Sequence, residues 1–262
     1  MNPRTWILAG ALAAATAFVA PQFVLGQARS GYLPSGTIDI TRVLQAAPQK
    51  GDAQYEADRA IFKATRHWLG TPRGDLATRD VKTDPTSMFA DFSCALGVTL
   101  TPATAPATIR LIGKSSVDTA GQSGAAKEYF KRLRPFLIDQ GPICQPAEDM
   151  KGSYDYPSGH ATWGWTWAIL LSELAPDRAT PILTRGRAFG ESRIVCGAHN
   201  SSAVDAGRTT ASATLAAVQA QPAFQTDLAA ARAELDKLRA DPATPKPQNC
   251  AAEEALLSQP IL

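Results

Sequence analysis

Apolar residues recur at intervals of three and four along most of the chain, which is the spacing of an amphipathic helix. One such set runs from Ala57 to Trp68 and stops at the Gly-Thr-Pro of residues 70–72. Further helices are predicted over residues 88–96, 117–133, 178–195, 204–220 and 225–240. Residues 161–174 are strongly apolar and include three tryptophans, which predicts a buried helix. Alternating runs of β-branched residues, which would indicate strands, are scarce. We therefore predict an all-α protein with a single helical-bundle domain, because no linker or repeat divides it.

Two segments lack the helical spacing. Residues 29–50 contain scattered Gly and Pro, and we predict an extended arm that lies on the body of the protein. Residues 141–157 are rich in Gly, Pro, Asp and Ser. This predicted loop is long enough to be functional rather than a simple connection.

The first 28 residues have the pattern of an export signal. Arg4 supplies the positive start, and residues 6–19 form an apolar run too short to span a bilayer comfortably. Cleavage is predicted after Gly26 or Ala28, which leaves residues 29–262 as the mature domain. A membrane anchor that stays attached is the alternative. No later stretch reaches ~18 uninterrupted apolar residues, so we expect a periplasmic or secreted protein without a membrane partner after cleavage.

The composition is that of an ordinary globular protein. The 262 residues are 45% hydrophobic and 19% charged, which excludes wholesale disorder and collagen-like repetition. The net charge of +2 provides no basic excess for binding nucleic acid. Only three histidines are present, so a His-rich metal site is not expected. The oligomeric state is left open, a homo-oligomer included.

The four cysteines predict two disulfides. They are even in number, form no CxxC pair, and would enter an oxidising compartment after export. Cys94 and Cys196 lie in apolar segments, whereas Cys144 and Cys250 lie near prolines in predicted loops. This favours Cys94–Cys196 and Cys144–Cys250 among the three connectivities. Four buried free thiols are the alternative.

A first candidate segment for chemistry is basic. Lys127 and Arg134 are seven residues apart, which is two turns of helix, so we predict that they lie on one face and that Pro135 closes that helix. Two cations on one stripe suit a dianion. A solvated basic face that includes Lys131 and Arg132 is the alternative.

The second segment, residues 156–160, leads directly into the predicted buried helix. Ser158 and Gly159 at a helix start would present backbone N–H groups at the positive end of the helix dipole. The Ser158 hydroxyl adds a donor, and His160 could protonate a leaving group. Alternatively, Ser158 only caps the helix and His160 is a surface residue.

The third segment covers residues 190–199. Arg193 carries a planar, charged group that suits phosphate oxygens. His199 follows the break at Cys196 and Gly197, as if it stood at the start of the next helix. A hydrogen-bonded core histidine is the alternative. His67 has no motif around it and is interpreted as structural.

Together these segments resemble the phosphatidic-acid-phosphatase type 2 superfamily, in particular its bacterial class A non-specific acid phosphatases. The family pattern is K-x6-R-P, then P-S-G-H, then S-R-x5-H-x3-D. The chain matches ten of the eleven specified positions in order, at Lys127, Arg134-Pro135, residues 157–160, Ser192-Arg193 and His199. The resemblance extends further, from the stretch at Ala64 to that at Arg208, and so covers most of the mature chain.

The resemblance implies a helical bundle of the phosphatidic-acid-phosphatase type 2/vanadium-haloperoxidase type that hydrolyses phosphate monoesters with broad specificity. His199 would attack phosphorus to form a phosphohistidine, and His160 would protonate the leaving alcohol. The phosphate oxygens would be held by Lys127, Arg134, Ser158, Gly159 and Arg193. Neither a metal nor another cofactor is implied, since three cations would face the phosphate.

One position departs from the family pattern. The family has Asp four residues after the nucleophilic histidine, where it orients the ring, and this chain has Ala203. In serine proteases the comparable orienting residue is worth about 10⁴ in rate. Asp205 would point about 120° away on an ideal helix, whereas Ser202 or a backbone carbonyl could reach the ring.

Because both histidines and all phosphate ligands are kept, we expect an active but slower phosphatase. Two alternatives remain open. One is a phosphoester-binding protein with little turnover. The other is a vanadate-dependent haloperoxidase-like activity, against which the short length of the chain counts.

Overall fold

The computed structural model describes residues 30–262, and the predicted signal sequence lies outside the described residues. The described part is helical and contains no strand, which confirms the all-α prediction. Within it, no helix is both long and apolar enough to cross a membrane. The α-helices are α1 (Ala53–Ala64), α2 (Pro72–Arg79), α3 (Pro85–Leu96), α4 (Pro106–Phe130), α5 (Gly159–Leu174), α6 (Ala179–Val195), α7 (Ser201–Val218), α8 (Pro222–Ala240) and α9 (Cys250–Leu257).

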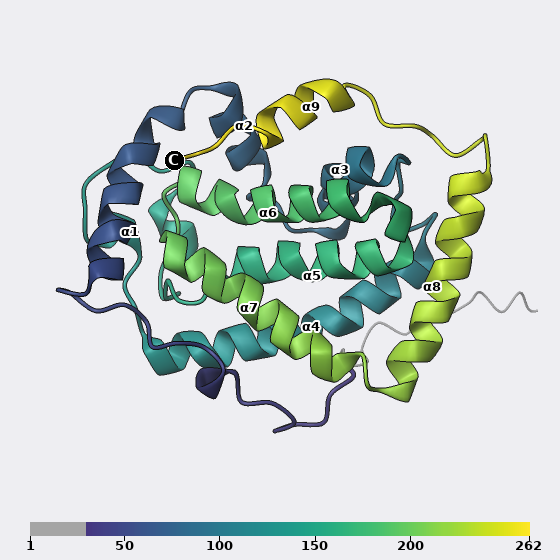
Figure 1. Cartoon of the computed structure of the whole chain (residues 1–262), viewed down its shortest axis with the longest axis horizontal. Helices are drawn as coiled ribbons and strands as arrows, with labels where there is room; N and C mark the ends of the chain where they lie inside the picture. Colours follow the sequence, from purple (N-terminus) through teal and green to yellow (C-terminus); the bar gives the residue numbers. More distant parts are fainter. Residues whose placement is uncertain (1–29) are drawn as a thin grey trace, which may run out of the picture.

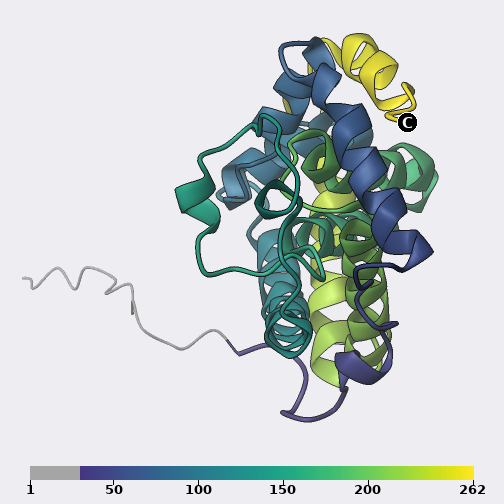
Figure 2. The same cartoon turned by 90° about the vertical axis from the view of Figure 1, so that its left-hand side faces the viewer.

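Helix α5 lies at the centre of the bundle. It packs between α4 and α6, while α7 crosses it and α8 closes one end (Figures 1 and 2). Its sequence explains this position, because apolar residues lie on all sides of it and a helix of that kind is stable only when surrounded. The N-terminus of α5 is thereby held at one fixed place in the bundle.

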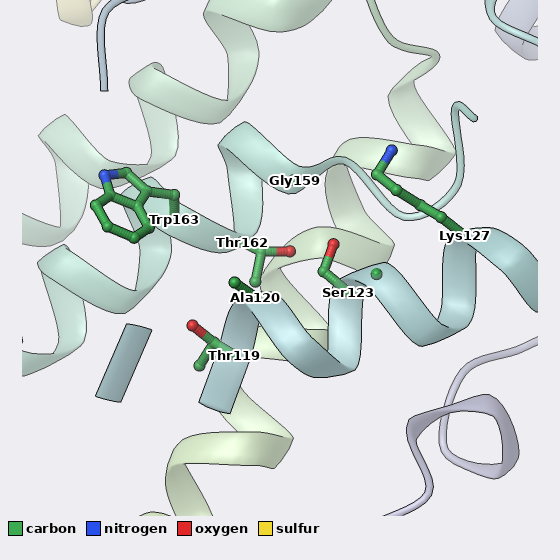
Figure 3. A pocket seen from close by; sticks show the side chains of 8 residues that line it. Thr119, Ala120, Ser123, Lys127, Gly159, Thr162 and Trp163 are labelled. Carbon is green, nitrogen blue, oxygen red and sulfur yellow. The ribbon is translucent and has the colours of Figure 1, made fainter. Parts of the chain in front are cut away.

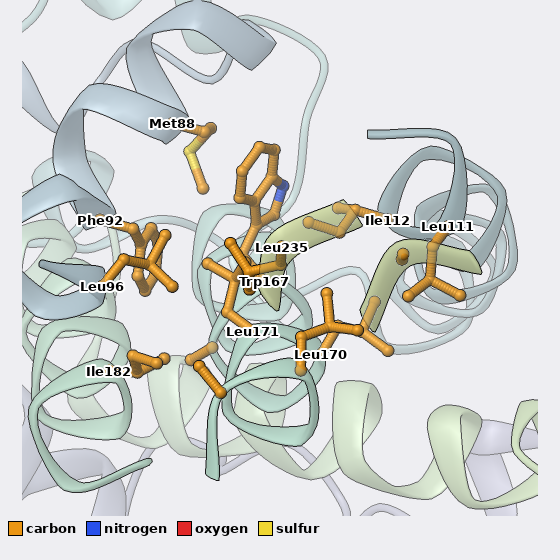
Figure 4. Packing of buried hydrophobic residues seen from close by; sticks show 14 of the residues in the cluster. Met88, Phe92, Leu96, Leu111, Ile112, Trp167, Leu170, Leu171, Ile182 and Leu235 are labelled. Atoms are coloured by element: carbon orange, nitrogen blue, oxygen red, sulfur yellow. The ribbon is translucent and has the colours of Figure 1, made fainter. Parts of the chain in front are cut away.

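The main core is built around Trp167 of α5 (Figure 4). This side chain is fully buried, and its ring meets the edge or face of two α3 rings. The centroid distances are 5.1 Å to Phe89 at an interplanar angle of 81° and 6.2 Å to Phe92 at 19°. An aromatic cluster of this kind contributes a large share of the buried apolar surface. It fixes α3 against α5 and so makes the scaffold beneath the site rigid.

Prolines decide several boundaries that apolar spacing missed. Pro72 is the first residue of α2, a helix that the spacing did not predict, and Thr71 caps it by accepting from the Gly74 N–H at 3.3 Å. Pro at a first helical position starts a helix as readily as it stops one. Pro106 likewise opens α4, which runs unbroken to Phe130. Helix α9 was not predicted either.

The N-terminal arm is confirmed. The Tyr32 backbone N–H donates to the Asp118 carboxylate at 2.7 Å, and the Tyr32 hydroxyl donates to Asp227 at 2.7 Å. Further along, Ile40 is buried in a small cluster beside α4 and α7. The arm therefore lies across helices that are far apart in sequence.

Both disulfides form, but the favoured connectivity was wrong. Cys94 pairs with Cys250 and Cys144 pairs with Cys196, with Cα–Cα distances of 5.3 and 4.7 Å. Apolar surroundings do not select partners, whereas a disulfide needs its Cα atoms within about 7 Å. One bond ties α9 to α3, and the other ties the 141–157 loop to the end of α6.

Candidate active site

The three motif segments meet at one end of the bundle. Lys127 lies in the last turn of α4, Ser158 precedes α5, Arg193 lies in the last turn of α6, and His199 lies between α6 and α7. Burial lowers the pKa of His199 well below its ordinary range, and the charges of the nearby cations lower it further. Both effects favour the neutral form of the ring, which has a free electron pair.

The predicted reason for pairing Lys127 with Arg134 was wrong. Helix α4 ends at Phe130, and Lys131 is left-handed with φ 49°, so the two cations do not share a helical face. Arg134 instead lies in the extended segment before Pro135. Its guanidinium donates to the Ser153 carbonyl at 2.8 Å and to the Ala198 carbonyl at 2.9 Å. These bonds, rather than a helix, aim it into the site.

The contacts of His199 define its tautomer. Arg134 Nη1 lies 2.9 Å from His199 Nε2, and a guanidinium can only donate. Nε2 therefore carries the electron pair and Nδ1 carries the proton. The prediction that His199 stands just before a helix is confirmed, since α7 begins at Ser201. The unprotonated nitrogen faces the arginine and the protonated one faces the 141–157 loop.

Two oxygen atoms of Asp155 lie within hydrogen-bond distance of His199 Nδ1. Its backbone carbonyl is 2.8 Å from Nδ1 and its carboxylate Oδ1 is 3.0 Å away. The backbone carbonyl matches one of the predicted alternatives, but the carboxylate was missed. Ser202 is instead bonded to Asp58, and Asp205 to Arg208. The one feature of the sequence that could have indicated this carboxylate is the position of Asp155, directly before the Tyr-Pro-Ser-Gly-His segment.

Lys127 is a half-buried cation at the end of α4. Its Nζ donates to the Tyr154 carbonyl. Burial, and then the charge of Arg134, lower the pKa of Lys127 to about 7. The ammonium form is therefore present in acidic solution and is lost as the pH rises through 7, which predicts a pH effect on anion binding.

We expect Lys127→Arg to move the alkaline fall of kcat/KM for a phosphate monoester upward by about one pH unit or more. A guanidinium does not titrate in this range, so the site would stay cationic. The measurement is a pH–rate profile with p-nitrophenyl phosphate. Lys114→Arg, on the same helix but paired with Asp227 at 3.1 Å, is the control and should leave the profile unchanged. An unaltered profile in Lys127→Arg would show that another group causes the fall.

Arg193 has buried hydrogen-bond donors without acceptors. Its Nη2 donates to Gln145, but Nε and Nη1 have no partner among the described residues. Burial lowers the pKa of Arg193 to about 9. A buried guanidinium with unmet donors is costly, and an anion would satisfy it. This side chain therefore indicates where an anion binds.

The start of α5 combines capping with exposed donors. The Ser158 hydroxyl accepts from the Ala161 N–H at 3.3 Å, so it caps the helix, which leaves its own proton free to donate. The Gly159 N–H belongs to the first turn, where no intrahelical acceptor exists. His160 is partly buried rather than a surface residue, and its Nε2 lies 3.0 Å from the Val81 carbonyl. Burial, and then the charge of Arg193, lower its pKa to about 3.

A pocket of about 200 Å³ opens beside these groups, between α4 and α5 (Figure 3). Two buried polar atoms near it, Ser123 Oγ and Trp163 Nε1, have no partner within residues 30–262. The lining residues are Thr119, Ala120, Ser123, Gly124, Lys127, Gly159, Thr162 and Trp163. Because Lys127 and Gly159 belong to both, the pocket is continuous with the predicted phosphate site.

The motif residue Ser192 and the third histidine, His67, lie outside the site. Ser192 donates to Asp80 at 2.6 Å and accepts from Arg73 at 3.1 Å, so it joins α6 to α2. His67 is exposed and contacts the Ala64 carbonyl, which agrees with a structural residue. No group of three or more His, Cys, Asp or Glu suited to a metal ion occurs in the described part of the chain.

The chain is similar to several bacterial phosphatases. A family model described as the PAP2 superfamily matches residues 108–226, which include every predicted site residue. An acid phosphatase of Zymomonas mobilis is 39% identical over 214 residues, which cover 81% of each chain. A non-specific acid phosphatase of Providencia stuartii is 34% identical, covering 78% of this chain and 84% of that one. One of Salmonella typhimurium is 33% identical, covering 78% and 82%.

Proposed function

Because the chain belongs to the PAP2 superfamily, as a relative of the bacterial acid phosphatases, we propose that it hydrolyses phosphate monoesters through a phosphohistidine on His199. The observation that carries this proposal is the buried pair of unsatisfied donors on Arg193. Lys127 and Arg134 add charge at the same place, and both lower the pKa of His199. Three cations around a neutral imidazole suit a phosphate dianion next to a nucleophile.

In the first step, His199 Nε2 attacks phosphorus. The Nε2–P bond forms as the bond from phosphorus to the leaving oxygen breaks, and His160 gives its proton to that oxygen. Nε2 of His160 is held by the Val81 carbonyl, so its Nδ1 serves the substrate. A bound dianion raises the pKa of His160 and so opposes the effect of the surrounding cations.

In the second step, water attacks phosphorus on the side opposite to the bond with His199 Nε2. His160, now neutral, takes a proton from the water as the Nε2–P bond breaks, which returns inorganic phosphate and neutral His199. The guanidinium of Arg134 contacts Nε2 in the free protein. We propose that it moves to a phosphate oxygen when substrate binds. Arg193 and the Gly159 N–H hold the other oxygens.

The organic part of the substrate would occupy the pocket between α4 and α5. This pocket begins at Lys127 and Gly159 and ends at Trp163. Its wall is mostly small side chains, with unpaired donors at Ser123 and Trp163. Such a wall accepts alcohols of different shape, which supports small-molecule phosphate monoesters and broad specificity.

We propose that the protein acts in the periplasm or outside the cell. The two disulfides support this location, because such bonds persist in oxidising compartments. The signal sequence over residues 1–28, and with it a mature chain from residue 29, remains a prediction.

The decisive experiment is an activity assay of the purified mature protein. We expect hydrolysis of p-nitrophenyl phosphate in the presence of EDTA, because the cations of the site are side chains. Vanadate should inhibit, since it resembles the five-coordinate phosphorus of the transition state. Release of p-nitrophenol is measured directly.

Three results would contradict the proposal. Strong inhibition by EDTA that a divalent ion reverses would contradict the metal-free mechanism. Phosphate binding without turnover would indicate a binding protein. Halide oxidation with vanadate, bromide and peroxide, in a protein without phosphatase activity, would indicate a haloperoxidase.

A further inference from the structure

The nucleophile of the proposed reaction needs a group that holds its ring and balances the charge that forms on it. When His199 Nε2 bonds to phosphorus, the imidazole becomes cationic and keeps its proton on Nδ1. A carboxylate at Nδ1 stabilises that cation more as the reaction proceeds than in the ground state. The place four residues after His199 holds Ala203, which is fully buried and has no polar side chain.

We infer that Asp155 is the positioning residue of His199, and that a carboxylate from the 141–157 loop does what a residue on α7 would otherwise do. This inference rests on the proposed function. Asp155 Oδ1 lies 3.0 Å from His199 Nδ1, and both side chains are buried. Because Nε2 accepts from Arg134, Nδ1 is the donor in this contact.

The carboxylate of Asp155 is itself held on several sides. The Asn200 backbone N–H donates to Oδ1 at 3.1 Å, and the Asn200 side-chain amide donates to Oδ2 at 2.8 Å. Its own backbone N–H donates to the Arg132 carbonyl at 2.9 Å. A group fixed in this way orients the ring with little loss of entropy at the moment of reaction. Asn200, which donates both of these hydrogen bonds to the carboxylate, directly follows the nucleophile His199 in the sequence.

Arg132 lies beside this buried carboxylate, and its positive charge favours the ionised form. Burial raises the pKa of Asp155, and the charge of Arg132 opposes that shift. The guanidinium is 3.5 Å from Asp155 Oδ2 but makes its shorter contact, 2.8 Å, with Asp58. Arg132 therefore lies on the Oδ2 side of the Asp155 carboxylate, whereas the imidazole contacts the other oxygen, Oδ1. Lys127 adds a weaker opposing charge.

The alternatives for orienting the ring are occupied or distant. The Ser202 hydroxyl donates to Asp58 and accepts from Arg132 at 2.7 Å. Asp205 is exposed and bonds Arg208 at 2.9 Å. Besides Asp155, the contacts of the His199 ring within residues 30–262 are those with Arg134. The backbone carbonyl of Asp155 can hold the ring in place, but only the carboxylate supplies a full opposing charge.

The test compares Asp155→Asn with Asp58→Asn, a control that removes an equally buried carboxylate from the same cluster. Rapid quenching with p-nitrophenyl phosphate gives the rate constant of phosphoenzyme formation, and inhibition by inorganic phosphate reports ground-state binding. We expect Asp155→Asn to slow phosphoenzyme formation about 10²- to 10⁴-fold, with phosphate inhibition changed by less than about threefold. Asp58→Asn should lower Tm but keep the rate within about tenfold of wild type.

Equal rate constants in the two variants would overturn the inference, because the loss would then follow stability alone. A wild-type enzyme that forms no phosphoenzyme would overturn the proposed function as well. If Asp155→Asn does not fold, the inference can still be tested on the wild-type protein by determining the tautomer of His199. In ¹⁵N-histidine spectra, with His199 assigned from His199→Ala, we expect a protonated Nδ1 and an unprotonated Nε2. The opposite tautomer at His199 would overturn the inference.

Discussion

His199→Ala is expected to abolish phosphoenzyme formation and to lower kcat at least about 10⁴-fold. Within the described part of the chain, His199 is the one imidazole that contacts Arg134, with its Nε2 at 2.9 Å. The other side chains that accept from Arg134 are the Ser153 hydroxyl at 3.1 Å and the Met150 sulfur at 3.6 Å, which are weaker nucleophiles than a neutral imidazole. Removing a covalent nucleophile leaves only the charge stabilisation of the three cations. Phosphate release and labelling with ³²P-substrate measure the two effects separately.

The matched control is His67→Ala. This ring is exposed and lies on the 3-10 turn after α1, where it contacts the Ala64 carbonyl and the Trp68 ring. Its loss should leave both kcat and labelling unchanged. Tm should be close to wild type in the control. Labelling that persists in His199→Ala would mean that a different residue is phosphorylated.

The second large effect depends on the substrate. His160→Ala should lower kcat/KM about 10²- to 10⁴-fold for an alkyl phosphate such as glycerol phosphate. The loss should be much smaller for p-nitrophenyl phosphate, because a good leaving group departs without a proton. The ratio of the two losses is the measured quantity, and it is insensitive to the amount of folded enzyme.

Equal losses for the two leaving groups would contradict the acid role of His160. A useful companion is Ser192→Ala, since Ser192 is in a neighbouring motif but bonds Asp80 instead of facing the site. We expect that variant to be less stable, with the same relative loss for both substrates. Only the removal of a proton donor should lower kcat/KM more for the alkyl phosphate than for p-nitrophenyl phosphate.

Local sequence was sufficient for most of the helices, but it missed two short ones and placed the start too late where a longer helix begins at a proline, as at Pro85, Pro106 and Pro222. The apolar pattern identified the central helix because residues 161–174 are strongly apolar throughout and α5 buries side chains on every side. It missed α2 and α9, which have eight residues each and bury few apolar side chains. Short helices are stabilised mainly by tertiary packing, so their own sequence carries a weak signal.

The disulfides show a second kind of limit. An even count of cysteines in a chain predicted to be exported was enough to expect two bonds. The pairing depended on which segments the fold brings together. Cys94 and Cys250, for example, are 156 residues apart in the sequence and meet only in the folded protein. Local hydrophobicity contains no information about which distant segments meet.

The sequence by itself determined the all-α class and the motif residues, because each motif is local and its residue types suit one chemistry. Only the tertiary structure decided how they meet: Arg134 reaches the site from beyond the end of α4, held by carbonyls of two other segments. It also decided that Asp155 lies at His199 Nδ1, although 44 residues separate them. Ala203 marked where a carboxylate was missing, but folding alone brings in a replacement from a distant loop.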